Sequence, residues 1–275
     1  MTVSTYLKSI ADNAVLSPSE KETISRSEAA LKQKLSAHFG AEIKEQFRFG
    51  SYDRGTILPR SMDARSDVDY MIVFDNTGFR PQTYLDKLRR FVTEKYTKSE
   101  ISQNYPVIQL ELSHIRFELV PAVRTFIYGL SIPQKDETEQ HWMSTDPKDV
   151  NANLTAKNGE NNFLIKPLVR LVKYWNACND HLFGSFDLEK QVIEYDFTYL
   201  GFFPPKDLKG YFFEFMKSRP ELWQPQRRME KVQKAKKIID EVKRLESAGQ
   251  WTEAEAEIKK LIPPSSGVTR KTLYG

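Results

Sequence analysis

The order of apolar and polar positions divides the chain into a mixed first half and a helical second half. Apolar residues recur at helical spacing over residues 18–38 and 83–96, which predicts two helices. Ser17, Pro18 and Glu20 are the residue types preferred at a helix start, so the first helix has a defined beginning. Short runs rich in β-branched and aromatic residues predict strands between and after these helices. The predicted strands cover residues 43–49, 68–74, 107–112 and 115–123.

The second half of the chain has a different pattern of polar and apolar residues. Residues 135–160 are polar and rich in Asn, Asp and Thr, and we interpret them as a long loop or linker. The helical pattern then returns, and the predicted helices cover residues 162–179, 187–196, 209–217, 226–247 and 252–261. We therefore expect an α+β protein with a mixed lobe over residues 1–150, a helical lobe over 151–262 and a flexible tail over 263–275.

Composition adds limits on the class of protein rather than on its chemistry. The apolar fraction of 40% and the charged fraction of 28% are ordinary for a soluble globular protein. Mean hydropathy is −0.55, and no apolar run approaches the ~18 residues that cross a bilayer. The first residues lack the pattern of a signal peptide, and Cys178 is the single cysteine, which excludes an internal disulfide. We expect a cytoplasmic protein with no membrane partner.

A pair of carboxylates is the first candidate for chemistry. Asp67 and Asp69 open a predicted strand two residues apart, so their side chains lie on the same face. Two such groups repel each other unless a cation lies between them, and hard oxygen ligands suit Mg²⁺ or Mn²⁺. Glu118 is the acid expected to join them from a neighbouring strand, on the face opposite to its apolar neighbours. Glu111, on the preceding strand, is the alternative third ligand.

Gly50-Ser51, at the end of the strand before the acids, is the second candidate. Glycine allows close approach of the backbone to a phosphate, and adjacent N–H groups with a serine hydroxyl can bind phosphate oxygens. Arg54 and Arg60 in the following loop would add counter-charge. A Gly-Ser pair alone is usually a simple turn, and Asp-x-Asp alone is common at exposed strand ends. Their conjunction with a third acid two strands later is far more specific.

These motifs carry a resemblance to a known superfamily. Phe49-Gly50-Ser51 followed by Asp67-Val68-Asp69 resembles the signature of the DNA polymerase β-like nucleotidyltransferases. A longer match, over about residues 47–197, resembles the bacterial relatives of animal cyclic GMP–AMP synthase and oligoadenylate synthase, the CD-NTases of anti-phage signalling. The matching stretches are Phe49-Gly50-Ser51-Tyr52-x-Arg54-Gly55-Thr56-x-Leu58-Pro59, Ser66-Asp67-Val68-Asp69, Phe117-Glu118-Leu119-Val120-Pro121-Ala122, Leu168-x-x-Leu171-x-Lys173-Tyr174-Trp175-Asn176 and Ser185-Phe186-x-Leu188-Glu189.

The resemblance implies a fold and a set of ligands. The fold would be a polymerase-β-type catalytic lobe with a helical C-terminal lobe and a nucleotide site in the cleft between them. Asp67, Asp69 and Glu118 would be catalytic and would hold two Mg²⁺ ions. The third acid is more often Asp in the superfamily, which keeps Glu111 open as an alternative.

The resemblance also implies nucleotide contacts. Gly50 and Ser51 would bind the donor triphosphate, with Arg54 nearby. In the helix predicted over residues 162–179, Lys173 matches the family motif and would contact the triphosphate, as would Ser185. The ordinary alternative for the basic positions of that helix is a solvated face, and we assign no binding role to the other basic residues there.

The resulting hypothesis is a metal-dependent nucleotidyltransferase that joins NTPs into a cyclic or linear oligonucleotide second messenger, in anti-phage signalling. One alternative is transfer of a nucleotide to tRNA or protein, as in toxin-type enzymes, and another is a catalytically inactive nucleotide sensor. The net charge of +4 is small, and the basic positions between Lys231 and Lys237 are typical of a solvated helix face. We therefore expect NTP substrates, no obligatory nucleic acid, and regulatory or effector proteins as partners.

Overall fold

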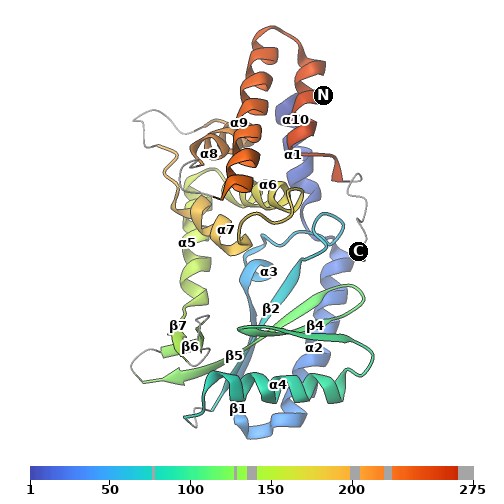
Figure 1. Cartoon of the computed structure of the whole chain (residues 1–275), viewed down its shortest axis with the longest axis vertical. Helices are drawn as coiled ribbons and strands as arrows, with labels where there is room; N and C mark the ends of the chain where they lie inside the picture. Colours follow the sequence, from blue (N-terminus) through green and yellow to red (C-terminus); the bar gives the residue numbers. More distant parts are fainter. Residues whose placement is uncertain (76–77, 127–128, 135–140, 199–204, 220–224, 266–275) are drawn as a thin grey trace. The chain divides into compact units, whose positions relative to one another are not determined.

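The chain forms two compact units in the computed structural model. The structure describes residues 1–75, 78–126, 129–134, 141–198, 205–219 and 225–265 (Figure 1). The first unit, here called the sheet unit, comprises Leu16–Arg60 and Arg65–Ala152. The second, the helical unit, comprises Met1–Val15, Ser61–Ala64 and Asn153–Gly275. Each unit is described below by itself.

The sheet unit is built on one mixed sheet, which has seven strands in the described residues. The strands are β1 (Ile43–Phe49), β2 (Asp67–Phe74), β3 (Glu100–Asn104), β4 (Val107–Glu111), β5 (Arg116–Thr125), β6 (Gly129–Pro133) and β7 (Trp142–Ser144). The main order is β1-β2-β5-β4-β3, and outside this order β6 pairs with both β5 and β7. Strands β2 and β5 are parallel, whereas the other described pairs are antiparallel.

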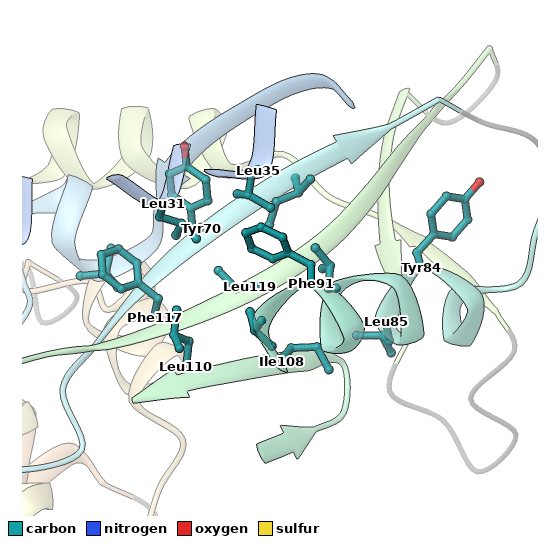
Figure 2. Close-up of a cluster of buried hydrophobic side chains, with 14 of the residues drawn as sticks. Leu31, Leu35, Tyr70, Tyr84, Leu85, Phe91, Ile108, Leu110, Phe117 and Leu119 are labelled. Atoms are coloured by element: carbon teal, nitrogen blue, oxygen red, sulfur yellow. The ribbon is translucent and has the colours of Figure 1, made fainter. Parts of the chain in front are cut away.

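One face of this sheet is buried under two helices, α2 (Pro18–Phe39) and α4 (Pro81–Lys95). Side chains alternate along a strand, so Tyr70 of β2 and Phe117 of β5 share this face. Figure 2 shows Leu31 and Leu35 of α2 and Phe91 of α4 packed among them. The alternation leaves the acids of β2 and β5 on the opposite face, as the sequence pattern predicts.

The start of α2 confirms the predicted capping signal. The Ser17 hydroxyl accepts a hydrogen bond from the Glu20 amide at 3.2 Å, and the Glu20 carboxylate accepts one from the Ser17 amide at 2.8 Å. This reciprocal pair satisfies two N–H groups that a helix otherwise leaves without a partner. The helix then runs to Phe39, one residue beyond the expected end.

Helices make up the helical unit. They are α1 (Val3–Asn13), α6 (Ile165–Ala177), α7 (Ser185–Glu194), α8 (Leu208–Ser218), α9 (Gln226–Ser247) and α10 (Trp251–Leu261). The five in the second half confirm the predicted helices to within three residues at each end. Inside the described ranges, no helix is both long and apolar enough to cross a membrane.

The first fifteen residues differ from the expectation that residues 1–150 form one lobe. Helix α1 packs against α6, α8 and α10, and its apolar stripe, which includes Leu7 and Ile10, is buried there. The Tyr6 hydroxyl also donates to the Ile262 carbonyl at 2.7 Å, close to the end of the described chain. This apolar stripe places the segment in the helical unit, because its burial needs the later helices.

The expected loop over residues 135–160 is wrong in its described part. Strand β7 lies there, followed by α5 (Pro147–Glu160), and the boundary between the two units falls inside α5, after Ala152. The side chains of α5 are polar on nearly every side, so the apolar periodicity that predicts a helix is absent. Residues 135–140 lie outside the described part of the chain. Residues 266–275, which belong to the expected flexible tail, lie outside it as well. A second difference lies in the segment after β1, where Arg54 and Arg60 were expected to lie in a loop. This segment begins with a short helix, α3 (Gly50–Arg54).

Candidate active site

The two acids of β2 lie beside Glu118 of β5. Asp67 and Asp69 are half-buried on the sheet face opposite the core. In the parallel pairing of the two strands, Asp69 is the direct partner of Glu118 and Asp67 is the partner of Arg116. Neighbouring strands lie about 4.8 Å apart, and side chains of paired residues point to the same face. The predicted orientation of Glu118 is therefore confirmed, and its carboxylate lies in the same row as that of Asp69.

The Gly50-Ser51 turn is packed directly against Asp69. Strands β1 and β2 are antiparallel, and Phe49 is the partner of Asp69, so the chain enters the turn opposite this acid. Gly50 has a φ of +74°, and a Cβ added to it would lie 1.8 Å from the Asp69 Oδ2 atom and 2.6 Å from its Cγ. No side chain fits in that space, because real Cβ contacts are not shorter than 3.0 Å. The glycine thus serves two needs, a left-handed backbone and contact with a carboxylate.

Ser51 is held by its backbone and keeps its hydroxyl available. Its carbonyl accepts hydrogen bonds from the amides of Thr56 at 2.9 Å and Ile57 at 3.0 Å, which closes the turn after α3. Over the described residues, the Ser51 hydroxyl has no hydrogen-bond partner. This arrangement suits a hydroxyl that donates to an external phosphate oxygen. Arg54, the last residue of α3, is 5% exposed and lies inside the sheet unit.

The alternative third acid, Glu111, is already engaged by two arginines. Its carboxylate accepts a hydrogen bond from Arg60 at 2.5 Å and one from Arg116 at 2.8 Å. Arg60 was expected to add counter-charge near a phosphate, and the structure instead pairs it with this glutamate. Glu118 accepts from the neutral side chain of Gln109 at 2.8 Å. A carboxylate already held by two cations is a poorer metal ligand, so this arrangement favours Glu118 over Glu111.

A small recess adjoins the turn within the sheet unit. Its volume is about 110 Å³, and it is lined by Phe47, Arg48, Phe49, Gly50, Asp53, Arg54, Pro147, Lys148 and Asn151. Arg48 is paired with Glu28 at 2.5 Å and lies over the Tyr52 ring. Lys148 comes from the first turn of α5, the helix that the sequence analysis missed. The signal that could have indicated this helix start is Asp146, whose carboxylate caps the amide of Lys148 at 3.0 Å.

The candidate residues of the second half lie in the helical unit. Lys173 and Arg170 of α6 are 6% and 9% exposed, so these two positions are not the solvated face that was the alternative. The Arg170 guanidinium donates to the Ala11 carbonyl at 3.3 Å, and its burial lowers the pKa of that group from its ordinary value. Ser185 is exposed and is the first residue of α7. The contact of Lys173 and Ser185 with a triphosphate stays a prediction.

The carboxylate oxygens of the site are suitable ligands for a hard cation, but they do not by themselves form a complete metal site. In the part of the chain that the structure describes, no group of three or more His, Cys, Asp or Glu side chains is arranged to hold a metal. Asp67, Asp69 and Glu118 offer oxygen ligands from one face of two paired strands. Mg²⁺ is usually bound by one or two carboxylates together with substrate phosphates and water. The residues therefore fit a cation that is shared with a phosphate ligand.

Comparison with solved structures gives the fold class. The chain matches CdnC from Escherichia coli MS115-1, determined with ATP, at a TM-score of 0.68 and 14% identity, covering 95% of this chain and 98% of that one. It also matches the cyclic AMP-GMP synthase DncV from Vibrio cholerae, determined with a linear intermediate, at a TM-score of 0.63 and 13% identity, over 81% and 69% of the two chains. The fold is that of the polymerase-β-like nucleotidyltransferases, as the resemblance in the sequence implied.

Comparison of sequences gives the family. Residues 1–158 match the Second Messenger Oligonucleotide or Dinucleotide Synthetase domain, SMODS, and the chain belongs to this family. A relative from Bacillus cereus (strain VD146), named as a probable cyclic nucleotide synthase, is 29% identical over 214 residues, which are 64% of this chain. The match spans 62% of that relative, so this chain accounts for less than two thirds of its length.

Proposed function

We propose that this protein is a metal-dependent nucleotidyltransferase that joins NTPs into a cyclic or linear oligonucleotide and releases pyrophosphate. The observation that carries the proposal is the contact between Gly50 and Asp69, which brings a phosphate-type turn against an acid paired with Glu118. Membership of the SMODS family supports the reaction, as do relatives named as cyclic nucleotide synthases. The product would act as a second messenger in anti-phage signalling in the cytoplasm.

In the proposed reaction, one group of residues in the sheet unit binds the triphosphate and another binds the metal. The Ser51 hydroxyl and the backbone of the turn bind oxygens of the donor triphosphate, and Gly50 lets the turn pack against Asp69. Asp67, Asp69 and Glu118 would hold Mg²⁺ or Mn²⁺, which supplies charge neutralisation at the triphosphate and activation of the acceptor hydroxyl.

Two residues of the helical unit are further candidates for contact with a triphosphate. Lys173 would bring a positive charge to it, and Ser185 would donate a hydrogen bond. Lys173 lies within a buried stretch of α6 and Ser185 opens α7, so each has a backbone fixed by a helix. We propose both as nucleotide contacts together with Arg54.

We also propose a class of partner for the enzyme, a protein regulator. One of the solved structures that the chain resembles is CdnC in complex with a HORMA protein, and we infer that a protein regulator is compatible with this fold. The four basic residues of α9 that were interpreted as a solvated face are partly or fully exposed, so this face needs no nucleic acid to account for it; they are Lys231, Lys234, Lys236 and Lys237. We therefore propose that NTPs and a divalent metal suffice for activity.

The test is product formation from purified protein. The nuclease-treated enzyme is incubated with each labelled NTP, alone and in mixtures, with Mg²⁺ or Mn²⁺, and the products are separated by chromatography before and after phosphatase treatment. We expect phosphatase-resistant oligonucleotides that are absent with Asp69→Asn. Labelling of added tRNA or protein, with no small product, would favour the toxin-type alternative. Nucleotide binding without turnover under all conditions would favour the inactive sensor. Activity only with added duplex DNA or RNA would overturn the claim that NTPs and metal suffice.

A further inference from the structure

A row of polar side chains crosses the sheet in register from its edge to the candidate metal site. Ser102 of β3 is paired with Gln109 of β4, and Gln109 is paired with Glu118 of β5. Glu118 is in turn paired with Asp69 of β2. Paired residues share a face, so all four side chains lie on the face opposite the core. The row therefore connects an exposed position on the edge strand with an acid at the phosphate turn.

The members of this row are joined by directed hydrogen bonds. The Ser102 hydroxyl donates to the Gln109 Oε1 atom at 2.9 Å, and the Gln109 Nε2 atom donates to the Glu118 Oε1 atom at 2.8 Å. The first bond determines the second, because an amide whose oxygen accepts from Ser102 must direct its NH₂ group towards Glu118. Ser102 thus fixes which end of the Gln109 amide meets the carboxylate.

The donor to Glu118 is neutral, although an arginine lies two residues away on the same strand. Arg116 is on the same strand as Glu118, two residues away, and on the same face of the sheet. Its guanidinium donates to Glu111, which also binds Arg60. A cation on Glu118 would compete with a metal for the carboxylate, whereas an amide orients it and leaves its charge in place. The pairing of Glu111 with both arginines helps to keep this charge uncompensated.

We propose that Gln109 is a positioning residue for the third carboxylate of the site, with Ser102 setting the orientation of its amide. The proposal rests on the function proposed above, and it assigns to Gln109 no contact with substrate or metal. Glutamate is a long and flexible side chain, and one oxygen held by Gln109 restricts the directions that the other can take. Hydrogen-bond partners of metal ligands commonly change metal affinity or activity 10- to 100-fold when they are removed.

The experiment measures metal binding apart from turnover. Free Mn²⁺ is quantified by electron paramagnetic resonance during titration of the full chain, with a non-hydrolysable ATP analogue present. Gln109→Leu keeps the size of the side chain and removes its donor, and we expect the dissociation constant for Mn²⁺ to rise about 10-fold. Ser102→Ala should weaken binding less, because the Gln109 amide can still donate after it loses its fixed orientation. Gln103→Ala is the matched control: Gln103 adjoins Ser102 on the edge strand and instead donates to Gln82 at 3.2 Å.

Turnover and a double variant complete the test. We expect Gln109→Leu to lower kcat about 10- to 100-fold with a smaller change in KM for NTP. The kcat of Gln109→Asn should lie between those of the wild type and Gln109→Leu. In a Glu118→Gln background, Gln109→Leu should cause no further loss of Mn²⁺ binding, since the two residues act through one ligand. Circular dichroism and thermal melts check that each variant is folded.

The outcomes separate this inference from the proposed function. If Glu118→Gln weakens Mn²⁺ binding and folded Gln109→Leu binds as the wild type does, the positioning role is overturned and the proposed function stands. If Gln109→Leu weakens Mn²⁺ binding but the wild type makes no oligonucleotide, the positioning role stands and the proposed function fails. A wild type that binds no Mn²⁺ in the presence of the nucleotide analogue overturns both.

Discussion

Replacement of Gly50 by alanine tests the geometry on which the proposed function depends. The new Cβ would lie 1.8 Å from Asp69 Oδ2, where contacts shorter than 3.0 Å essentially do not occur, so the carboxylate has to move by roughly 1 Å or more. A displacement of that size in a catalytic group costs on the order of 100-fold in rate. The positive φ of +74° adds about 1–2 kcal/mol of backbone strain, which lowers stability as well.

A second glycine of the same turn provides the control. Gly55 follows α3 with a φ of +70°, and a Cβ added to it would meet nothing within 4 Å. Gly55→Ala should therefore show the backbone strain alone, with a melting temperature lower by a few degrees and turnover close to that of the wild type. Steady-state pyrophosphate release and thermal melts measured on both variants give the comparison. The role given to the contact between Gly50 and Asp69 is refuted if Gly50→Ala keeps more than about a tenth of wild-type turnover while it is destabilised as much as Gly55→Ala.

Three further predictions concern the acids and the frame around them. Asp67→Asn or Asp69→Asn should abolish turnover and leave the metal-free melting temperature unchanged or slightly raised, because carboxylate repulsion is relieved; more than a few per cent of residual activity would contradict the metal site. Glu118→Gln should reduce pyrophosphate release nearly as much, whereas Glu111→Gln should chiefly lower the melting temperature by breaking its arginine pairs; the reverse pattern would make Glu111 the third ligand. Ser17→Ala should cost about 1 kcal/mol in urea unfolding and leave activity intact, and an unchanged unfolding midpoint would contradict the role of the capping box.

The sequence predicted much of the site because its signals are local. Alternation along a strand determines which side chains share a face, so the common face of Asp67 and Asp69 and the orientation of Glu118 followed from the order of residues alone. The choice between Glu118 and Glu111 could not follow from it. That choice depends on the pairing of Glu111 with Arg60 and Arg116, and these contacts exist only once the loop and two strands have come together.

The contact between Gly50 and Asp69 could not be predicted from the sequence, for a related reason. It requires the register of β1 against β2, which no local pattern encodes. The missed elements have two different causes. Helix α5 buries only Leu154 and Asn158 among its side chains, so it carries almost no periodic signal. Helix α1 does carry such a signal, since Leu7 and Ile10 belong to a regular apolar stripe, and a stripe of this kind is typical of an amphipathic helix.

The division of the chain between the two units has a consequence for synthesis on the ribosome. Residues Met1–Val15 are made before the sheet unit, yet α1 packs on α6 and α8, which are made after the whole sheet unit. At about 5–20 residues per second, the apolar stripe of α1 stays without the full set of these partners for roughly ten to forty seconds. The sheet unit can fold during that interval, because its own segments all lie within Leu16–Ala152. The helical unit therefore completes its core after the sheet unit, although one of its helices, α1, is made before that unit.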